Sequence, residues 1–493
     1  MNEAHLPDDT TAPPPPPNAL NALLAWLAAP PAQPEDDLAP LLDHLATLRA
    51  ASVPSRQRRR LLALLGLRSK IALRGLHTEI AGISLPLSRR SRHIVRGLQN
   101  LLLTLAEDIL RAGASDAEAA WRALDALAAH LAISSYAGAP YAPGVWKMAH
   151  QIHRDAIAAG HVNEHVREAA CTVGDTYLRA CLLASVQPAS FTAPEIDRIV
   201  DYIARFSSRA AFIVPATQTA AAGSASIFWI DTSRDAPPTS ANRLPPPAGT
   251  LCFTCEQLAQ LAEEQADALE AGVGASELDL PESAGTPAGQ GILRRLAHRW
   301  GNPGKRRFPR RRQNHLSELC IGFKAVRSLF DEKATQPPDT SQWIVTNESP
   351  DGYAVMHVSG RTGRLTAGDL AGVRAEGRAG WEICIIRRVQ SENPEHLELG
   401  LQILGTRAQA AMLVSDGEDG APRQQPVLAL PALPPVRPEE VLLAPVGTVS
   451  RNAQTMALVV EGKCLEAREI RPADIVERTA GIELLTFSAV TPN

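Results

Sequence analysis

Lys-Arg-Arg-Phe-Pro-Arg-Arg-Arg (residues 305–312) and Asn-Glu-Ser-Pro-Asp-Gly (residues 347–352) are the two stretches around which this chain is organised. The first contains the pattern Arg-x-x-x-Arg. The second contains Asn-x-Ser-x-x-Gly and follows the strand-like run Trp-Ile-Val. Guanidinium groups bind phosphates in a forked geometry and stack on flat rings. Asn and Ser offer short hydrogen-bonding groups for the edge of a base, and Gly permits a close approach. Together the two patterns predict a site for a phosphorylated purine.

In this order the two patterns resemble the ligand signature of PilZ domains, which are bacterial receptors for cyclic di-GMP. Later landmarks resemble the later strands of that family's barrel: Leu-x-x-Gly-Asp from Leu365, the run Trp381–Arg388 and the run Leu397–Leu404. The resemblance covers residues 291–410. It implies an antiparallel β-barrel that binds cyclic di-GMP, with no other cofactor and no metal.

The resemblance also implies which residues bind the ligand: Arg306, Arg307, Arg310, Asn347, Ser349 and Gly352. Arg306 and Arg310 would clamp phosphates and guanines, with Arg307 as an auxiliary, and the strand residues would hold the edge of the other guanine. The same spacing joins Arg307 to Arg311, so the register is open by one residue and Arg311 is the alternative. The long interval between the two patterns is predicted to hold a helical insert at residues 323–330.

Two other interpretations of the basic stretch stay open. Nine Arg or Lys residues lie within residues 294–312, and a solvated, flexible linker has this composition. Clustered arginines also bind nucleic acid by releasing counterions. Few aromatic residues are interleaved, however, and no nucleic-acid-binding motif surrounds the stretch, which disfavours this class.

Composition sets the broad class of the protein. The chain has 493 residues, enough for several domains, and a formal net charge of −4, so no overall field favours nucleic acid or an anionic membrane. No signal peptide and no apolar run long enough to span a membrane are visible. Seven widely spaced cysteines do not form a disulfide pattern. These features predict a cytoplasmic protein.

The N-terminal half has helical periodicity. The clearest helix is predicted at residues 88–113, and Ser115 with Glu118 is predicted as the capping box of the next one. Further helices are predicted at residues 145–159, 164–184 and 193–206. No fixed repeat is found, so a bundle or an irregular array is expected and not a solenoid.

The predicted architecture is an α+β multidomain protein with a helical N-terminal half, a PilZ-like antiparallel β-barrel and a β-rich C-terminal tail. The tail is either a second small barrel or an elaboration of the first. The predicted segments are a disordered proline-rich tail (1–17), a helical domain (18–210), a mixed α/β connector (211–275), a linker (276–290), the barrel (291–410) and the C-terminal unit (411–493).

Catalytic signatures are missing from the sequence, including those of enzymes that make or degrade cyclic di-GMP, so no enzyme is predicted. Cys252-x-x-Cys255 has no second pair and is interpreted as structural. The predicted function is a non-catalytic cyclic di-GMP receptor that couples its barrel to an unknown protein partner through the helical half. The alternatives are an interaction scaffold whose barrel has lost its ligand and, third, a nucleic-acid-binding protein.

Overall fold

The computed structural model describes most of the chain, with short gaps. The described residues are 19–31, 33–113, 116–166, 171–213, 226–247, 249–304, 308–393, 396–416, 422–434, 437–448, 456–461 and 465–490. The predicted proline-rich tail (1–17) lies outside them. The chain forms two compact units: one of Met1–Ile80, Arg90–Ile133 and Tyr141–Tyr177, and one of Ala81–Arg89, Ser134–Pro140 and Leu178–Asn493.

Helices make up the N-terminal half. They are α1 (Ala19–Ala28), α2 (Leu38–Ala50), α3 (Ser55–Ala81), α4 (Arg89–Arg111), α5 (Ala117–Tyr136), α6 (Val145–Ala158), α7 (Val173–Ser185) and α8 (Ala193–Phe206). α4 buries one face at spacings of three and four residues, as its periodicity predicts. α5 is capped by Asp116, whose carboxylate accepts a hydrogen bond from the Ala119 amide (2.8 Å); the predicted cap, Ser115, lies outside the described residues. α7 begins nine residues later than predicted.

Within the described residues, a small sheet and three further α-helices follow α8. The sheet has the order β1-β4-β2-β3, and its strands are β1 (Ala211–Ile213), β2 (Ile227–Ile230), β3 (Thr239–Ser240) and β4 (Leu251–Thr254). The next helices are α10 (Glu256–Glu270), α11 (Pro287–Gly301) and, later, α12 (Phe323–Ser328). Residues 276–290, predicted as a linker, contain two short 3-10 helices with Leu280 and Ala284 buried, so this segment is packed.

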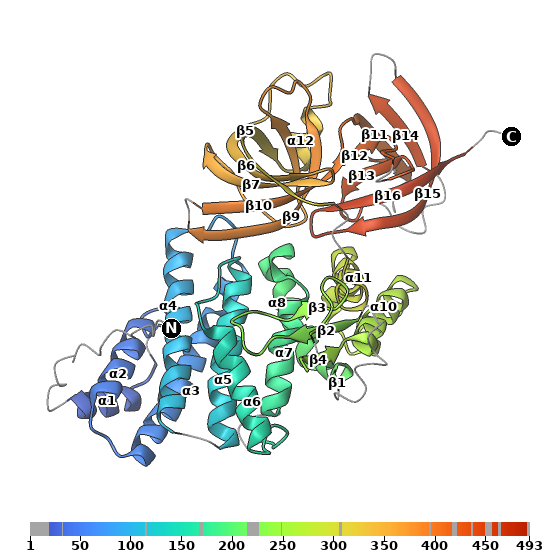
Figure 1. Ribbon diagram of the computed structural model, residues 1–493. Coiled ribbons are helices and arrows are strands. Elements are labelled where there is room, and N and C mark those ends of the chain that lie inside the picture. Colours follow the sequence, from blue (N-terminus) through green and yellow to red (C-terminus); the bar gives the residue numbers. More distant parts are fainter. Residues whose placement is uncertain are drawn as a thin grey trace. The chain divides into compact units, whose positions relative to one another are not determined.

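The first barrel is closed and antiparallel, in the order β10-β7-β6-β5-β8-β9 (Figure 1). Its strands are β5 (Arg311–Ile321), β6 (Ser341–Ser349), β7 (Gly352–Ser359), β8 (Leu370–Ala375), β9 (Glu382–Asn393) and β10 (His396–Gly405). Its interior is filled by apolar side chains such as Trp343, Val355 and Leu399. The predicted helical insert is present as α12, between β5 and β6.

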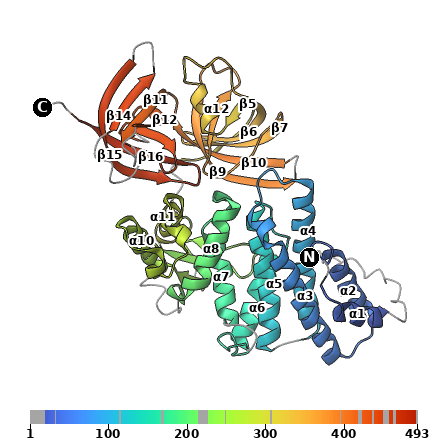
Figure 2. The ribbon, with the colours of Figure 1, turned by 180° about the vertical axis from the view of Figure 1, so that it is seen from behind.

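The C-terminal tail forms a second closed barrel, in the order β11-β12-β13-β16-β15-β14, beside the first (Figures 1 and 2). Its strands are β11 (Gln409–Asp416), β12 (Pro422–Leu430), β13 (Val441–Pro445), β14 (Met456–Glu461), β15 (Leu465–Arg478) and β16 (Ile482–Ala489). This settles the open alternative in favour of a second barrel. The predicted fold class, a helical half followed by a PilZ-like barrel and a β-rich tail, is confirmed.

One apolar cluster lies between the two barrels. It contains Leu370, Ile383 and Ile385 of the first barrel, Val326 of α12, and Leu443 and Leu484 of the second barrel, all buried. Because a sheet presents alternate residues on its two faces, each barrel can have an apolar interior and still offer apolar residues outside. In the described part of the chain, no helix is long and apolar enough to cross a membrane.

Candidate functional site

The pattern Asn-x-Ser-x-x-Gly forms the turn between β6 and β7. Ser349 and Gly352 are partners in the antiparallel register, so Pro350 and Asp351 make the tight turn between them. The Ser349 hydroxyl lies 2.6 Å from a carboxylate oxygen of Asp351 and 3.1 Å from the carbonyl oxygen of Gly352. A hydroxyl has one proton to donate and two lone pairs to accept with. Ser349 therefore supports the turn and can still accept a hydrogen bond from a ligand.

Gly352 is required by a close approach of two strands. A Cβ atom at this position would lie 2.0 Å from the carbonyl oxygen of Leu401 in β10. Backbone atoms there cannot move aside without breaking the pairing of β7 with β10, so only glycine fits. Gly352 has a structural role whether or not it contacts a ligand.

A β-bulge decides which way the site residues face. Val345 pairs with Val355, but Asn347 pairs with Ala354, so Thr346 is an extra residue in β6. Val345 and Val355 belong to the barrel interior. Simple alternation from Val345 would turn Asn347 inward, whereas the bulge reverses its direction. Asn347 thus faces the outside of the barrel, as Ala354 does.

The start of β5 lies directly beside this strand. Arg312 pairs with Asn347 and Arg311 pairs with Glu348, so Arg312 shares the outer face with Asn347, and Arg311 follows the opposite face. Arg310 is exposed and immediately precedes β5. The structure therefore brings the basic stretch and the Asn-x-Ser-x-x-Gly turn together, and β5 with α12 accounts for the long interval between them. Arg306 and Arg307 lie outside the described residues.

The outer face continues as a row across five strands. Asn347 pairs with Ala354, Ala354 with Gly400, and Gly400 with Arg388 of β9. Small residues thus form the middle of the row, with Arg312 and Asn347 at one end and Arg388 at the other. Arg388 is held by Glu398 at 3.2 Å. Sequence reasoning missed Arg312 and Arg388, because only the strand register shows that they share this face.

The amide of Asn347 and the guanidinium groups of Arg311 and Arg312 have no hydrogen-bond or ion-pair partner within the described part of the chain. Polar groups without protein partners on an exposed face are available to bind a ligand. Arg311 stands apart from the other two, because its strand partner is the carboxylate residue Glu348. Glu348 itself accepts a hydrogen bond from the Gln313 amide (3.2 Å) and lies 3.7 Å from Arg378.

A separate polar cluster of Tyr353, Glu382 and Arg378 lies on the inner side of the same rim. The Tyr353 hydroxyl donates to Glu382 at 2.5 Å, and Arg378 pairs with the other oxygen of Glu382 at 3.0 Å. Burial and the hydrogen bond to Glu382 raise the pKa of Tyr353 far above its ordinary value. Tyr353 is therefore neutral at physiological pH, and this group stabilises the rim of the barrel.

Comparison with protein families gives two matches. Residues 21–217 match the N-terminal domain of the cyclic-di-GMP receptor FimW, and residues 326–410 match the middle PilZ domain of the same receptor. Together the two matches cover more than half of the chain. The chain belongs to this family of cyclic-di-GMP receptors. The curated proteins include no match to it.

The match to the middle PilZ domain begins inside α12 and ends at residue 410, two residues into β11. It therefore covers β6 to β10, and the first barrel is the PilZ barrel of this FimW relative. It includes the Asn-x-Ser-x-x-Gly turn and Arg388. The arginine stretch and β5 precede the matched residues. The predicted PilZ domain is confirmed, whereas the ligand-binding roles of the individual residues remain predictions.

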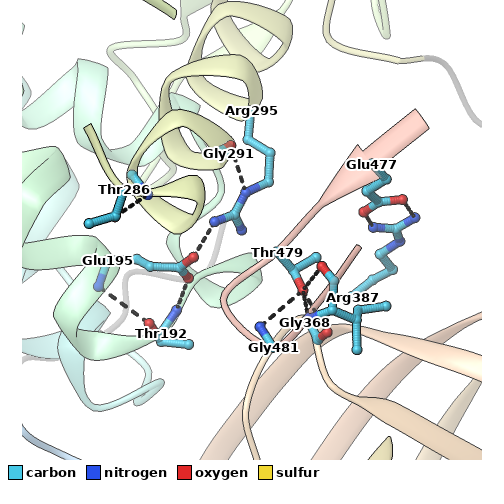
Figure 3. A network of polar contacts seen from close by, with 12 residues as sticks. Thr192, Glu195, Thr286, Gly291, Arg295, Gly368, Arg387, Glu477, Thr479 and Gly481 are labelled. Atoms are coloured by element: carbon cyan, nitrogen blue, oxygen red, sulfur yellow. Dashed lines mark hydrogen bonds and ion pairs between the residues drawn. The ribbon is translucent and has the colours of Figure 1, made fainter. Parts of the chain in front are cut away.

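Several arginines of the predicted basic stretch have structural roles in this FimW relative. Arg294 pairs with acidic residues of α10, among them Glu270 at 2.6 Å. Arg295 pairs with Glu195, the residue that completes the capping box of α8 (Figure 3). The next residue of this side of α11, Arg299, donates to Gln187 at 3.1 Å. These arginines fix α11 to its neighbours, so the stretch before residue 302 is not a flexible linker.

Arg387 connects the PilZ barrel to the second barrel. It is an extra residue in β9, since Gly400 pairs with Arg388 and Leu401 pairs with Ile386. Its guanidinium donates to the Gln402 side chain at 2.6 Å and pairs with Glu477 of β15 at 2.7 Å (Figure 3). Burial alone would raise the pKa of Glu477, but Arg387 and its neighbours hold it below its ordinary value. Gln402 is also the strand partner of Gly352, so this ion pair begins next to the candidate site.

Several arginines lie close together around Arg299 of α11. Burial, followed by the charges of Arg387, Arg243 and Arg295, lowers the pKa of Arg299 to about 10. Arg299 stays protonated at neutral pH, and Glu477 offsets part of the repulsion. A hydrogen bond from the Thr479 hydroxyl to the Gly368 carbonyl oxygen (2.9 Å) is a further contact between the barrels (Figure 3).

The cysteine pair at Cys252 and Cys255 lies where β4 leads into α10. Both side chains are buried free thiols, and burial raises the pKa of Cys255 well above its ordinary value. Cys255 directly precedes the first residue of α10. Among the described residues, no group of three or more His, Cys, Asp or Glu side chains is arranged to hold a metal ion.

Proposed function

We propose that cyclic di-GMP binds on the outer face of the PilZ barrel, between the basic stretch at the start of β5 and the row that ends at Arg388. The observation that carries this proposal is the pairing of Arg312 with Asn347, which joins the two sequence patterns on one face. Phosphates would lie against guanidinium groups, and guanine edges would meet Asn347 and Ser349.

The proposed ligand residues are those predicted from the sequence: Arg306, Arg307, Arg310, Asn347, Ser349 and Gly352. Alternation favours Arg310 over Arg311, because Arg310 stands two residues before Arg312 and Arg311 faces Glu348. Arg312 and Arg388 are added as contacts at the two ends of the row. The small side chains in the middle of the row, at Ala354 and Gly400, would let a flat ring lie against the strands.

The receptor is proposed to act without catalysis and to pass ligand binding on to a protein partner. The route begins at Gln402, whose side chain holds Arg387, and continues through Glu477 to the second barrel. A ligand that orders the Arg388 end of β9 also restrains Arg387, its neighbour in the chain. A ligand shifts the equilibrium between two conformations only by the difference in its affinity for them. Transmission by this route therefore requires that the Arg387–Glu477 ion pair differ between the free and the ligand-bound conformation.

The domain organisation is proposed as predicted: a tail, a helical domain, a connector, the PilZ barrel and a C-terminal unit, with the segment 276–290 joining connector to barrel. A cytoplasmic location is proposed as well. The free thiols of Cys171, Cys181, Cys320 and Cys384, together with the pair at the start of α10, suit a reducing compartment.

Calorimetric titration of the full chain with cyclic di-GMP tests the ligand. We expect micromolar or tighter binding, and much weaker binding of GTP, which cannot present two guanines and two bridging phosphates to one face. A titration without heat, together with no competition at about 100 μM ligand (a test concentration set by the affinity scale), would favour the scaffold. A fluorescent single-stranded oligonucleotide that binds where cyclic di-GMP does not would favour the nucleic-acid-binding class.

Hydrogen exchange tests the route between the barrels. Saturation with cyclic di-GMP should slow exchange in residues 308–312 and in the β6–β7 turn, and also in β15 around Glu477. Exchange that changes only at the first two places would leave the ligand site standing and exclude transmission through Arg387.

A further inference from the structure

α3 is held by its neighbours on several sides within the first unit (Figure 1). Arg68 donates to Asp37 at the start of α2 (2.8 Å), and Lys70 pairs with Asp125 of α5 (2.7 Å). Gly66 lies against a side chain of α4. A helix packed in this way needs no apolar residues on its remaining side.

The remaining side is nevertheless apolar. Leu64, Leu67 and Ile71 are 46%, 56% and 39% exposed, and no other helix in the described part of the chain has three large exposed apolar side chains. Their spacings of three and four residues place them in one line along the helix. This spacing is the one by which two helices pack along a seam. The three residues, which we call the α3 seam, form an exposed apolar strip of two turns.

Charged residues continue the line at both ends. Arg60 stands four residues before Leu64, and Arg74 stands three residues after Ile71, and both are exposed. Within the described residues, neither guanidinium has a hydrogen-bond or ion-pair partner. From Arg60 to Arg74 the line measures about 21 Å, at 1.5 Å per residue. The α3 seam is therefore bounded by two unpaired positive charges.

These charges determine which partner fits. A second copy of α3 would place arginine against arginine in either orientation: Arg60 against Arg74 when antiparallel, and each against itself when parallel. Like charges facing each other along a seam are destabilising. A helix with apolar residues in its centre and carboxylates near its ends satisfies both parts of the surface.

We infer that α3 is a docking site for an amphipathic helix of another protein, with an apolar centre flanked by acidic residues. The partner helix lies along α3 over about four turns. Its leucine-type residues cover Leu64, Leu67 and Ile71, and its carboxylates pair with Arg60 and Arg74. This site does not depend on the nucleotide site of the PilZ barrel.

A fluorescein-labelled synthetic helix tests this docking site. The probe has three heptads with leucine along one seam and glutamate at the flanking positions, and its partner probe carries lysine at those positions. Fluorescence anisotropy with the full chain should show the glutamate probe binding at least tenfold more tightly than the lysine probe. The double variant Arg60→Glu/Arg74→Glu should reverse this order.

Variants in the α3 seam supply the matched control. Leu67→Glu should weaken binding of the glutamate probe at least tenfold, whereas Ile157→Glu, at an apolar residue of α6 that is similarly exposed (50%), should leave it unchanged. Should Leu67→Glu fail to fold by circular dichroism, the arginine double variant, at exposed positions, still decides the question.

Two results would overturn the inference. The first is equal binding of both probes with no effect of Leu67→Glu. The second is sedimentation of the chain as a dimer that Leu67→Glu converts to a monomer, because the α3 seam would then be filled by a second copy. Titration of Leu67→Glu with cyclic di-GMP, expected to match the parent chain, separates failure here from failure of the nucleotide site.

Discussion

The PilZ barrel and the second barrel have the same strand order, but they differ on the outer face where the third and sixth strands meet. Numbering each barrel from its first strand gives the closed order 1-2-3-6-5-4 in both. In the PilZ barrel, the third and sixth strands meet at Ala354 and Gly400 on the outer face. In the second barrel, the same two strands meet at Leu443 and Leu484, which are buried in the cluster between the barrels.

The difference continues at the turn into the third strand. The PilZ barrel has a two-residue turn that ends at Gly352, and its β7 approaches β10 closely. The second barrel has a long proline-rich connection in its place, and β13 begins with Val441. Small and polar residues line the proposed ligand face of the PilZ barrel, while large apolar residues commit the corresponding face of the second barrel to packing. Topology alone therefore does not determine which barrel binds a nucleotide.

Leu443→Ala should have the largest effect on stability. Leu443 is fully buried between the barrels, and removing a buried leucine side chain costs about 2–5 kcal/mol. Urea denaturation should show this loss, while Val476→Ala at an exposed residue of β15 should change stability by less than about 0.5 kcal/mol. A small effect of Leu443→Ala would mean that this outer face of the second barrel contributes little to packing, and so does not differ in this way from the corresponding face of the PilZ barrel.

Arg310→Ala should weaken cyclic di-GMP binding about 10- to 150-fold, because a charge-assisted hydrogen bond contributes roughly 1.5–3 kcal/mol. The matched control is Arg407→Ala, the exposed arginine that precedes the first strand of the second barrel, which should leave affinity unchanged. Calorimetry measures both. Parallel titrations of Arg306→Ala, Arg307→Ala and Arg311→Ala fix the register.

Equal losses in all these arginine variants would contradict a specific clamp and indicate a diffuse basic field. Such a field is screened by salt, since charges separated by more than about 10 Å hardly interact at 0.1 M salt. Repeating the titrations at high salt therefore distinguishes stacked, forked contacts from general attraction.

Gly352→Ala should destabilise the PilZ barrel by roughly 1–3 kcal/mol, because the added methyl group would overlap the Leu401 carbonyl oxygen and force the strands apart. Gly380→Ala is the control, since a Cβ atom there would meet nothing within 4 Å. Chemical denaturation of both variants measures the effect. An unchanged stability of Gly352→Ala would show that β7 and β10 accept a side chain at this position, as β13 and β16 accept Val441 at the start of β13.

Glu477→Gln should have the smallest effect, roughly 1 kcal/mol or less, because the pair with Arg387 is partly exposed. The pKa of Glu477 is lowered from its ordinary value of 4.5 in the folded chain. Its stabilisation is therefore complete above pH 4.5 and is lost as the pH falls through the folded value. Urea denaturation at several pH values should show the difference between the parent chain and Glu477→Gln vanish on acidification. Glu440→Gln, at an exposed pair, should show no such trend.

The sequence predicts the elements of the site better than their directions. The boundaries of α8 match the prediction at both ends, because Thr192 and Glu195 form a capping box that marks where the helix begins. Alternation from Trp343 and Val345 would have placed Asn347 inside the barrel. The bulge at Thr346 reverses that direction, and no sequence pattern marks it.

The second barrel is harder to predict for a different reason. Its strands are visible as β-type runs, but strand order is set by pairings between residues far apart in the chain, such as Ala411 with Val460. Arg388 is missed in the same way, since its place opposite Gly400 depends on the bulge at Arg387. Long-range register therefore limits what the sequence reveals of this site.

The cluster shared by the two barrels has a consequence for cutting the chain. The polypeptide passes from one barrel to the next within Thr406–Ala408, yet Leu370, Ile383 and Ile385 pack against side chains beyond that connection. A fragment that stops at residue 410, where the match to the PilZ domain ends, would expose this apolar surface to water and associate through it. Only three residues of chain separate the two barrels, but one apolar cluster belongs to both. Nucleotide affinity should therefore be measured on a protein that contains both barrels.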